Sequence, residues 1–382
     1  MHIERLYAER FRNLDALEWR PHRHFNLVAG DNGQGKTNLL EAITVAAGLR
    51  SFRTAKLQDC VQFGQAAATI ALQYQRHAIR GDLAVQIASR GRKLFADGKP
   101  VAGAAEYLGR LVVVLFAPSD LQLPHAEPSE RRRWLDRVVF HHAPAHLGDL
   151  RQYEKVLGSR NALLKQARHS PVDLGMLDVY DGMLAHAGAA VASRRAAIVA
   201  RFAPILREVF AGIAAPGLRA DLAIVPKGVP AGLPDAEREP ALLKALRERS
   251  RADLALGYTT RGPHRDEVEL RLQDRPAQVH ASQGQARALV LALKIAEIRS
   301  LEATLGEPPV LLMDDVSSEL DAARNRALMT YLDALGGQVI LTTTDPAHIR
   351  VAAPRQVFTV QAGTLAPGAA FGREPTEPVF SP

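Results

Sequence analysis

The sequence predicts an α/β fold that both ends of the chain build together, with a mainly helical segment inserted between them. Three observations support this prediction. An apolar run at 25–29 is followed by a glycine-rich loop and then by helical spacing. The stretch 118–212 has helical character, and two strongly apolar runs, 310–314 and 338–343, return near the C-terminus. We therefore expect the two ends to form one α/β body around the insertion.

The composition is that of an ordinary globular protein. Hydrophobic residues make up 47% and charged residues 23% of the 382 residues, which excludes global disorder. At about 150 residues per domain, we expect two or three domains. The net charge of +7 suits an anionic partner without naming it. The single cysteine, Cys60, excludes an internal disulfide and a cysteine-based zinc site.

Charged residues interrupt every apolar stretch before it reaches the ~20 residues that a membrane span needs. The first residues also lack the apolar core of a secretory signal. We therefore expect a soluble, cytoplasmic protein with no membrane partner.

The N-terminal region predicts strands. Residues 2–11 form a short mixed segment, and 25–29 form the first compact apolar run. Further along, the pattern shifts toward period two in three runs, separated by glycine and charged turns, at 68–74, 83–89 and 111–117. We interpret 66–117 as antiparallel β-structure attached to the N-terminal segment.

The middle of the chain predicts a short antiparallel helical hairpin. Two stripes of apolar residues at helical spacing flank a turn at 169–175. The stripes consist of Leu150, Tyr153, Leu157 and Leu164, and of Leu177, Tyr180, Leu184, Val191 and Ile198. The alternative explanation is an ordinary bundle core without a special role.

The rest of the pattern completes a division into four parts. We expect a loop at 226–240, a strand at 268–272 and a long helix at about 283–304. The predicted parts are 1–117 and 251–362 as the two halves of the α/β head, 118–250 as the inserted helical lobe, and 363–382 as a disordered tail rich in Pro and Gly.

The segment Gly30 to Thr37, GDNGQGKT, fits the phosphate-loop pattern G-x-x-x-x-G-K-[ST]. Its glycines let backbone N–H groups turn toward phosphate oxygens, and the following helix adds the positive end of its dipole. Lys36 would then contact the β- and γ-phosphates, and Thr37 would bind Mg²⁺. The position after an apolar strand and before a helix disfavours an accidental glycine-rich turn. The pattern predicts a site for ATP and Mg²⁺.

A second acid is expected at the end of a strand to complete the metal site. Asp314 directly follows four apolar residues, and Asp315 comes next. Asp314 would bind the metal, while Asp315 would accept a proton from the attacking water. The competitor Asp120 fits less well, because Ala-Pro-Ser separates it from its strand. Lys36 and Asp314 are 314 − 36 = 278 residues apart, an arrangement typical of the SMC-like branch of ABC-type ATPases.

Further segments resemble known motifs of these ATPases. Residues 281–285, ASQGQ, resemble the ABC signature loop, and Ser282 is expected to cap the following helix. Residues 318–321, SELD, resemble the D-loop. Several segments resemble motifs of the RecF family and follow one another in the order expected for it. They are FRNL at 11–14, NGQGKTNLLEAI at 32–43, APSDLQL at 117–123, RRRWLD at 131–136, GPHRD at 262–266, SQGQAR at 282–287 and DDVSSELD at 314–321. The resemblance covers residue 1 to about 345.

The resemblance implies an SMC-type ATPase head, made of 1–117 and 251–362, without a long coiled coil. It implies that two heads dimerise head to tail around ATP and bind DNA, contacting the backbone of duplexes and of single-strand/double-strand junctions. It further implies slow, DNA-stimulated ATP hydrolysis that releases the dimer. The family acts with RecO and RecR at gaps and stalled forks, where it helps RecA to load. The cytoplasmic protein would then be associated with the nucleoid.

By matching position, the resemblance also implies roles for individual residues. Lys36, Asp315 and Ser282 are expected to be catalytic, Ser282 acting in trans, and Thr37 and Asp314 to bind Mg²⁺. Asp321 is expected at the dimer seam. The expected nucleotide-binding residues are Arg12, Asn13, Gly30, Asp31, Asn32, Gly33, Gln34, Gly35, Lys36, Thr37, Asn38, Ser282, Gln283, Gly284 and Asp321.

Three positions depart from the pattern of many ABC proteins. Asp315 stands where those proteins carry Glu, and its shorter side chain predicts slow turnover. Thr344 takes the place of the switch histidine of transporter ATPases. Neither Ser119 nor Gln122 is a clear equivalent of the Q-loop glutamine.

Clustered basic residues are candidates for contacts with DNA phosphates. The clusters are Arg131, Arg132 and Arg133; Arg50, Arg53 and Lys56; and Arg247, Arg249 and Arg251. Solvated helix faces or ion pairs are the alternative for each cluster. His264 and Arg265 belong either to a functional family motif or to a structural turn. The 7 Tyr and 2 Trp residues disfavour a base-stacking platform, so contact with a duplex backbone fits better.

Other functional classes fit less well. A transporter ATPase would carry a switch histidine and a shorter spacing between the phosphate loop and the acid. A chromosome-structural SMC protein would need hundreds of heptad residues, and a metabolic P-loop kinase would not use a signature-like loop. Another SMC-like DNA-repair or chromosome-associated ATPase is the remaining alternative.

Overall fold

The computed structural model describes residues 1–368 apart from 169, 172, 215–216, 317–319, 347–348, 350 and 352–354. The chain splits into two compact units. Unit 1 combines Met1–Pro118 with the chain from Leu305 onward, and unit 2 is Ser119–Thr304. The expected insertion ended at residue 250, whereas unit 2 also takes in 251–304, which includes the signature-like segment.

Unit 1 contains a six-stranded sheet in the order β15-β14-β3-β13-β12-β8. All pairs are parallel except that of β15 with β14. The strands are β3 (Phe25–Ala29), β8 (Val113–Phe116), β12 (Val310–Asp314), β13 (Val339–Thr343), β14 (Arg355–Gln361) and β15 (Thr364–Pro367). Every residue of β3, β12 and β13 is buried, as expected for continuous apolar runs in a parallel sheet.

A second, antiparallel sheet in unit 1 has the order β2-β1-β4-β5-β6-β7. Its strands are β1 (His2–Phe11), β2 (Leu14–Trp19), β4 (Ala67–Arg76), β5 (Ile79–Ala88), β6 (Gly91–Ala96) and β7 (Lys99–Pro100). This confirms most of the predicted antiparallel region. The inclusion of 111–117 was wrong, because β8 in that run pairs in parallel with β12 in the other sheet.

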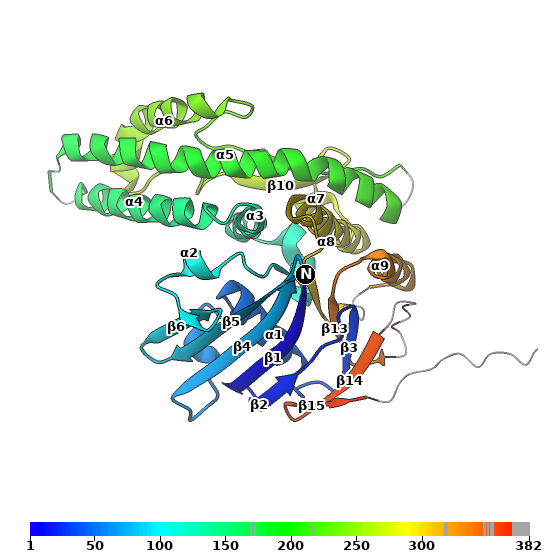
Figure 1. Cartoon of the computed structure of the whole chain (residues 1–382). Helices are drawn as coiled ribbons and strands as arrows, with labels where there is room; N and C mark the ends of the chain where they lie inside the picture. The colour runs from blue at the N-terminus through cyan, green and yellow to red at the C-terminus, as the bar shows by residue number, and fades with distance from the viewer. Residues whose placement is uncertain are drawn as a thin grey trace, which may run out of the picture. The chain divides into compact units, whose positions relative to one another are not determined.

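Helix α1 (Lys36–Gly48) packs against strands of both sheets (Figure 1). Its buried residues include Leu39, Leu40 and Ile43, the apolar side that the sequence predicts. Unit 1 also contains η1 (Leu57–Cys60), α2 (Ala104–Tyr107) and α9 (Ala322–Ala334). Because α1 follows β3 directly, this packing fixes the loop between them.

Unit 2 is mainly helical. Its helices are α3 (Pro128–His142), α4 (His146–Gln166), α5 (Leu174–Ile213), α6 (Asp235–Leu256), α7 (Ala277–His280) and α8 (Gln283–Leu305), and η2 (Pro118–His125) leads into them. A three-stranded sheet joins β9 (Ala220–Val225), β10 (Glu267–Leu272) and β11 (Arg275–Pro276). Among the described residues, no helix is long and apolar enough to cross a membrane.

The predicted helical hairpin is confirmed. Helices α4 and α5 pack side by side, and α6 packs against α5 (Figure 1). Tyr153 and Val156 of α4 meet Leu184 of α5 and Leu242 and Leu246 of α6 in one buried cluster. Positions 169 and 172 of the predicted turn lie outside the described residues.

Two expectations about irregular segments need correction. The loop expected at 226–240 ends early, because α6 begins at Asp235, and the acids Asp235 and Glu237 favour a helix N-terminus in the first turn. The tail expected from residue 363 begins with a strand, since Thr364–Pro367 pairs with β14 as β15. Residues 369–382 lie outside the described residues.

Candidate nucleotide-binding site

The phosphate loop connects β3 to α1, as its sequence pattern predicts. Gly35 stands at the start of α1 with a φ of 118°, a conformation that favours glycine. The buried ammonium of Lys36 turns back over the loop, where its Nζ donates to the carbonyl oxygens of Gly30 (2.6 Å) and Asp31 (2.9 Å). The loop therefore holds a cation at its centre, beside the exposed residues Asp31, Asn32 and Gly33.

Thr37 and Asp314 meet although they stand far apart in the sequence. The Thr37 hydroxyl donates to Asp314 Oδ1 over 2.9 Å. Hard oxygen ligands of this kind suit Mg²⁺, which keeps several waters and phosphate oxygens in its shell. In the described part of the chain, no three His, Cys, Asp or Glu side chains gather into a metal site of their own. The Thr37–Asp314 pair therefore fits a metal whose shell ATP and water complete.

Thr342 supports both acids and was missed by sequence reasoning. It lies opposite Asp314 in the register of β12 and β13, and its hydroxyl donates to Asp314 Oδ1 over 2.9 Å. Its carbonyl oxygen and its hydroxyl oxygen accept from the Asp315 backbone N–H (3.2 and 3.1 Å). Asp315 has a φ of 50°, a left-handed conformation that Asp tolerates better than most residues. This turn brings Asp315 to the end of the strand beside the predicted metal ligand.

The competitor Asp120 belongs to unit 2. Its carboxylate forms an ion pair with buried Lys294 over 3.2 Å inside unit 2. Asp314, in contrast, contacts Thr37 of the phosphate loop. Ser119 and Gln122, the weak candidates for the Q-loop, are both exposed on η2, and Thr344 is exposed after β13.

Arg12, expected to contact the nucleotide, is held by a buried acid. Its guanidinium donates to Glu41 from Nε (2.9 Å) and Nη2 (2.8 Å). Burial raises the pKa of Glu41, but hydrogen bonds from Arg12 and Ser51 outweigh burial and bring the pKa below its usual value. Glu41 is therefore a charged anchor that orients Arg12 next to the loop. Its position on α1, one turn after Thr37, was the sequence signal that could have identified it.

Asn13, also expected to contact the nucleotide, bridges the phosphate loop and the first turn of α1. Its Oδ1 accepts from Asn38 Nδ2 over 2.7 Å, and its Nδ2 donates to the Gln34 carbonyl over 3.2 Å. Arg53 donates to the Asn38 side chain over 2.7 Å. These bonds place Asn13, Asn38 and Arg53 in one polar layer against the loop.

In unit 2, the signature-like segment forms a reciprocal helix cap. Ser282 Oγ accepts from the Gln285 backbone N–H (3.2 Å), and Gln285 Oε1 accepts from the Ser282 N–H (2.9 Å). The predicted N-cap is thereby confirmed. Ser282 and Gln283 are exposed and Gly284 is half-buried, so this end of α8 presents polar groups to solvent.

Part of the D-loop lies outside the described residues, including Ser318 and Glu319. The half-exposed Asp321 caps α9, where its Oδ1 accepts from the Arg324 N–H over 3.0 Å. Its other oxygen pairs with the Arg324 guanidinium.

The first basic cluster, Arg131 to Arg133, contains both buried and exposed side chains. Arg131 is buried, pairs with Glu267 and donates to the Ala126 carbonyl over 2.6 Å. Arg132 donates to the Asp266 carbonyl over 2.8 Å. Both side chains therefore hold unit 2 together, which is the alternative explanation for this cluster.

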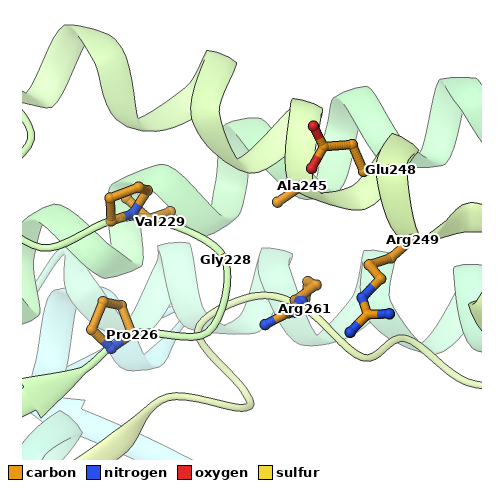
Figure 2. Close-up of a pocket in the computed structure, with 8 residues that line it drawn as sticks. Pro226, Gly228, Val229, Ala245, Glu248, Arg249 and Arg261 are labelled. Carbon is orange, nitrogen blue, oxygen red and sulfur yellow. The ribbon is translucent and has the colours of Figure 1, made fainter.

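The third basic cluster is more open. Exposed Arg247 pairs with exposed Asp178 over 2.8 Å, and Arg249 lines a pocket of about 480 Å³ together with Arg261 and Glu248 (Figure 2). Within the described residues, neither the Arg249 side chain nor the Arg261 side chain has a hydrogen-bonding or ion-pair partner. These two guanidinium groups are thus available to an anion.

The GPHRD segment is a structural turn. His264 Nδ1 accepts from the Tyr153 hydroxyl over 2.6 Å, and its Nε2 donates to the Thr259 carbonyl over 3.1 Å. Burial lowers the pKa of His264 to about 4, which keeps the ring neutral near pH 7. Buried Asp266 accepts from the Lys227 backbone N–H over 2.7 Å. The structure supports the structural interpretation for His264, while Arg265 is exposed over the Tyr258 ring.

A buried network of ion pairs joins helices α3, α4, α5 and α6. Fully buried Arg160 of α4 donates to Asp181 of α5 (2.6 Å) and to Asp253 of α6 (2.8 Å). It also donates to Thr259 over 2.8 Å. Buried Arg195 donates twice to Asp136, each over 2.8 Å. These arginines connect helices across the core of unit 2.

Known proteins are similar to this chain in sequence and in fold. A family model described as the RecF/RecN/SMC N-terminal domain matches residues 2–365. A protein named DNA replication and repair protein RecF from Anaeromyxobacter dehalogenans is 44% identical over 374 residues, which covers 96% of this chain and 99% of that protein. A protein of the same name from Geobacter metallireducens is 38% identical over 369 residues, with 96% and 100% covered.

Solved structures agree with these relatives. A structure described as the recombination mediator protein RecF-ATP in the RecFOR pathway is 27% identical, with a TM-score of 0.89 and coverage of 96% of this chain and 98% of that one. An Smc head bound to the C-winged helix domain of ScpA shares the fold, with 15% identity, a TM-score of 0.55 and coverage of 96% and 98%. Together with the full-length relatives, these matches show that the chain belongs to the RecF family of SMC-like proteins.

Proposed function

We propose that this chain is an ATP-dependent DNA-binding protein that acts in recombinational DNA repair and replication restart. The observation that carries the proposal is the contact of Thr37 Oγ1 with Asp314 Oδ1 at 2.9 Å. This contact brings together the phosphate loop and the acidic end of β12, which most of the sequence separates. An ATP site needs this arrangement. The RecF relatives and the RecF-ATP structure support the assignment.

Each residue of the nucleotide site has its own role in this proposal. Lys36 and the loop N–H groups bind and orient the phosphates, and Thr37 with Asp314 holds Mg²⁺. Bound Mg²⁺ neutralises charge on the phosphates. Asp315 orients the attacking water and accepts its proton. Its side chain is shorter than Glu, so we expect weak ATPase activity that DNA stimulates.

A second copy of the chain supplies the signature loop. Ser282 and Gln283 are exposed at the capped start of α8, where they are accessible to the nucleotide of a partner subunit. Hydrolysis then requires a head-to-tail dimer, because one subunit leaves the γ-phosphate cage incomplete. We propose that this dimer binds DNA at gaps and stalled forks, is released by slow hydrolysis, and acts with RecR and RecO to help RecA load.

The dimer is tested by the solution mass of an Asp315→Asn variant, measured by light scattering with and without ATP and Mg²⁺. We expect ATP to double the mass and Ser282→Arg in the same chain to abolish the doubling, because arginine blocks the partner's nucleotide. Ser170→Arg, an exposed serine after α4, serves as the control and should leave the doubling intact. A chain that binds ATP and stays monomeric contradicts the head-to-tail dimer.

The DNA contact is tested by the salt dependence of duplex binding in the presence of ATP. Arg249→Ala combined with Arg261→Ala should reduce the slope of log K against log salt by about two, since each arginine releases about one counterion. Arg247→Ala is the matched control on the same helix, because Asp178 already neutralises that charge. An unchanged slope in the double variant would place the phosphate contacts on another surface.

A further inference from the structure

We propose that the turn between β14 and β15 is a clamp that fixes the shape of the phosphate loop, with Asn13, Ala362 and Gly363 as positioning residues. The proposal rests on the ATP binding proposed above. None of the three residues needs to touch the reacting atoms, because they act through Gln34. The clamp joins the C-terminal end of the described chain to the nucleotide site near its N-terminus.

Gln34, in the middle of the loop, is held by three donors. Its carbonyl oxygen accepts from the Gly363 backbone N–H (2.8 Å) and from Asn13 Nδ2 (3.2 Å). Its side-chain Oε1 accepts from the Ala362 backbone N–H (2.7 Å). Two successive N–H groups of the turn therefore bind the main chain and the side chain of one loop residue.

The turn also packs against the loop without room to spare. A Cβ on Gly363 would lie 2.1 Å from the Asn13 carbonyl oxygen, and a Cβ on Gly30 would lie 2.6 Å from the Val360 carbonyl oxygen. Both contacts are backbone to backbone, so a side chain cannot rotate away to relieve them. The register pair Thr359 with Ala29 continues this contact into the sheet, since β14 runs parallel to β3. The hairpin thus contacts the strand that leads into the loop, the loop's first glycine and its centre.

A clamp of this kind answers a physical need of phosphate loops. The loop turns its N–H groups inward toward phosphate, so its carbonyl groups face outward and need donors of their own. Its glycines also give the free loop many conformations, whose loss opposes binding. Hydrogen bonds that hold the loop before the ligand arrives reduce that loss, which is preorganisation. The hairpin therefore contributes to nucleotide affinity through the shape of the loop.

The decisive variant is Gly363→Ala, and the chain offers a matched control. Gly98 stands in an equivalent two-residue turn, between β6 and β7, with a φ of 73° against 79° at Gly363. A Cβ on Gly98 meets nothing within 4 Å, whereas one on Gly363 meets Asn13. The backbone strain of alanine is thus the same at both positions, and only Gly363→Ala displaces the clamp.

The measurement is the Kd for ATP with Mg²⁺ by titration calorimetry, beside the Tm of each variant. We expect Gly363→Ala to raise the Kd about tenfold or more through lost preorganisation, and Gly98→Ala to leave it unchanged. The pair Gly363→Asn and Gly98→Asn repeats the test with a residue that tolerates positive φ. Amide exchange at 30–38 should quicken only in the Gly363 variants.

The outcomes separate this proposal from the one on which it rests. A parent chain that does not bind ATP refutes the ATP site itself. If the parent binds ATP and Gly363→Ala binds it as Gly98→Ala does, the clamp is refuted. Should Gly363→Ala fail to fold, Gln34→Met is the deciding variant, because it removes the side-chain amide whose Oε1 accepts from the Ala362 N–H and leaves the backbone of the loop unchanged. Weaker ATP binding by Gln34→Met supports the clamp, and parental affinity overturns it.

Discussion

Asp315→Asn is expected to lower kcat for ATP hydrolysis by about 10²–10⁴-fold, the usual contribution of a positioned general base. The change removes the carboxylate that we propose as the proton acceptor and keeps the shape of the side chain. It also preserves the backbone, because Asn tolerates the left-handed φ of 50° at this position as well as Asp does. The measurement is steady-state phosphate release at saturating ATP, with DNA present.

The Kd for ATP provides the internal control for this variant. The phosphate loop and the Thr37–Asp314 pair are untouched, so the Kd should stay within about threefold of the parent, a change of well under 1.4 kcal/mol. Loss of hydrolysis with retained binding assigns Asp315 to the chemical step. Hydrolysis at the parental rate would move the general base to another residue.

Arg160→Ala is expected to destabilise the protein by about 3–5 kcal/mol, because it leaves two buried carboxylates without their counter-charge. Asp181 and Asp253 both depend on this guanidinium, at 2.6 and 2.8 Å. Burial raises the pKa of Asp181 despite the ion pair, so the loss of Arg160 should drive that carboxyl toward its protonated form. Urea unfolding at pH 7, followed by circular dichroism, measures the loss.

Arg247→Ala is the matched control for burial. It breaks an Arg–Asp pair of similar length, 2.8 Å, between α6 and α5, but both partners are more than half exposed. Solvent screens an exposed pair and leaves it little net effect on stability, so this variant should unfold close to the parent. Equal losses in the two variants would show that burial is not what makes Arg160 important.

Much of the candidate nucleotide site could be predicted, because short sequence motifs contain most of its residues. The phosphate loop stands between an apolar strand and a helix, and Asp314 directly ends an apolar run. These two local patterns were therefore enough to predict that Thr37 and Asp314 belong to one site. Thr342 and Glu41 were missed, because the residues that they contact stand in other segments of the chain. Their roles depend on the register of β12 with β13 and on the face of α1 that meets Arg12.

Errors in the fold have the same origin. The run 111–117 looks like the strands before it, yet β8 pairs with β12, almost 200 residues further along. Strand partners depend on tertiary contacts that a local pattern does not record. The basic cluster shows the effect at the level of side chains, since Arg131 and Arg133 are close in sequence while one is buried and the other exposed. Gly363 of the turn was assigned to a Pro- and Gly-rich stretch that resembles a tail, whereas Ala362 was placed at the end of the head.

The split sheet also determines when the nucleotide site can form during synthesis. Unit 2 is continuous in sequence and can fold as it leaves the ribosome, but Asp314 emerges 278 residues after Lys36. At about 5–20 residues per second, this delay is on the order of tens of seconds. Throughout it, β3, which is buried along its whole length in the finished sheet, lacks both neighbours, β13 and β14. The nascent chain therefore carries an exposed apolar strand beside an unfinished phosphate loop until β13 and β14 have emerged.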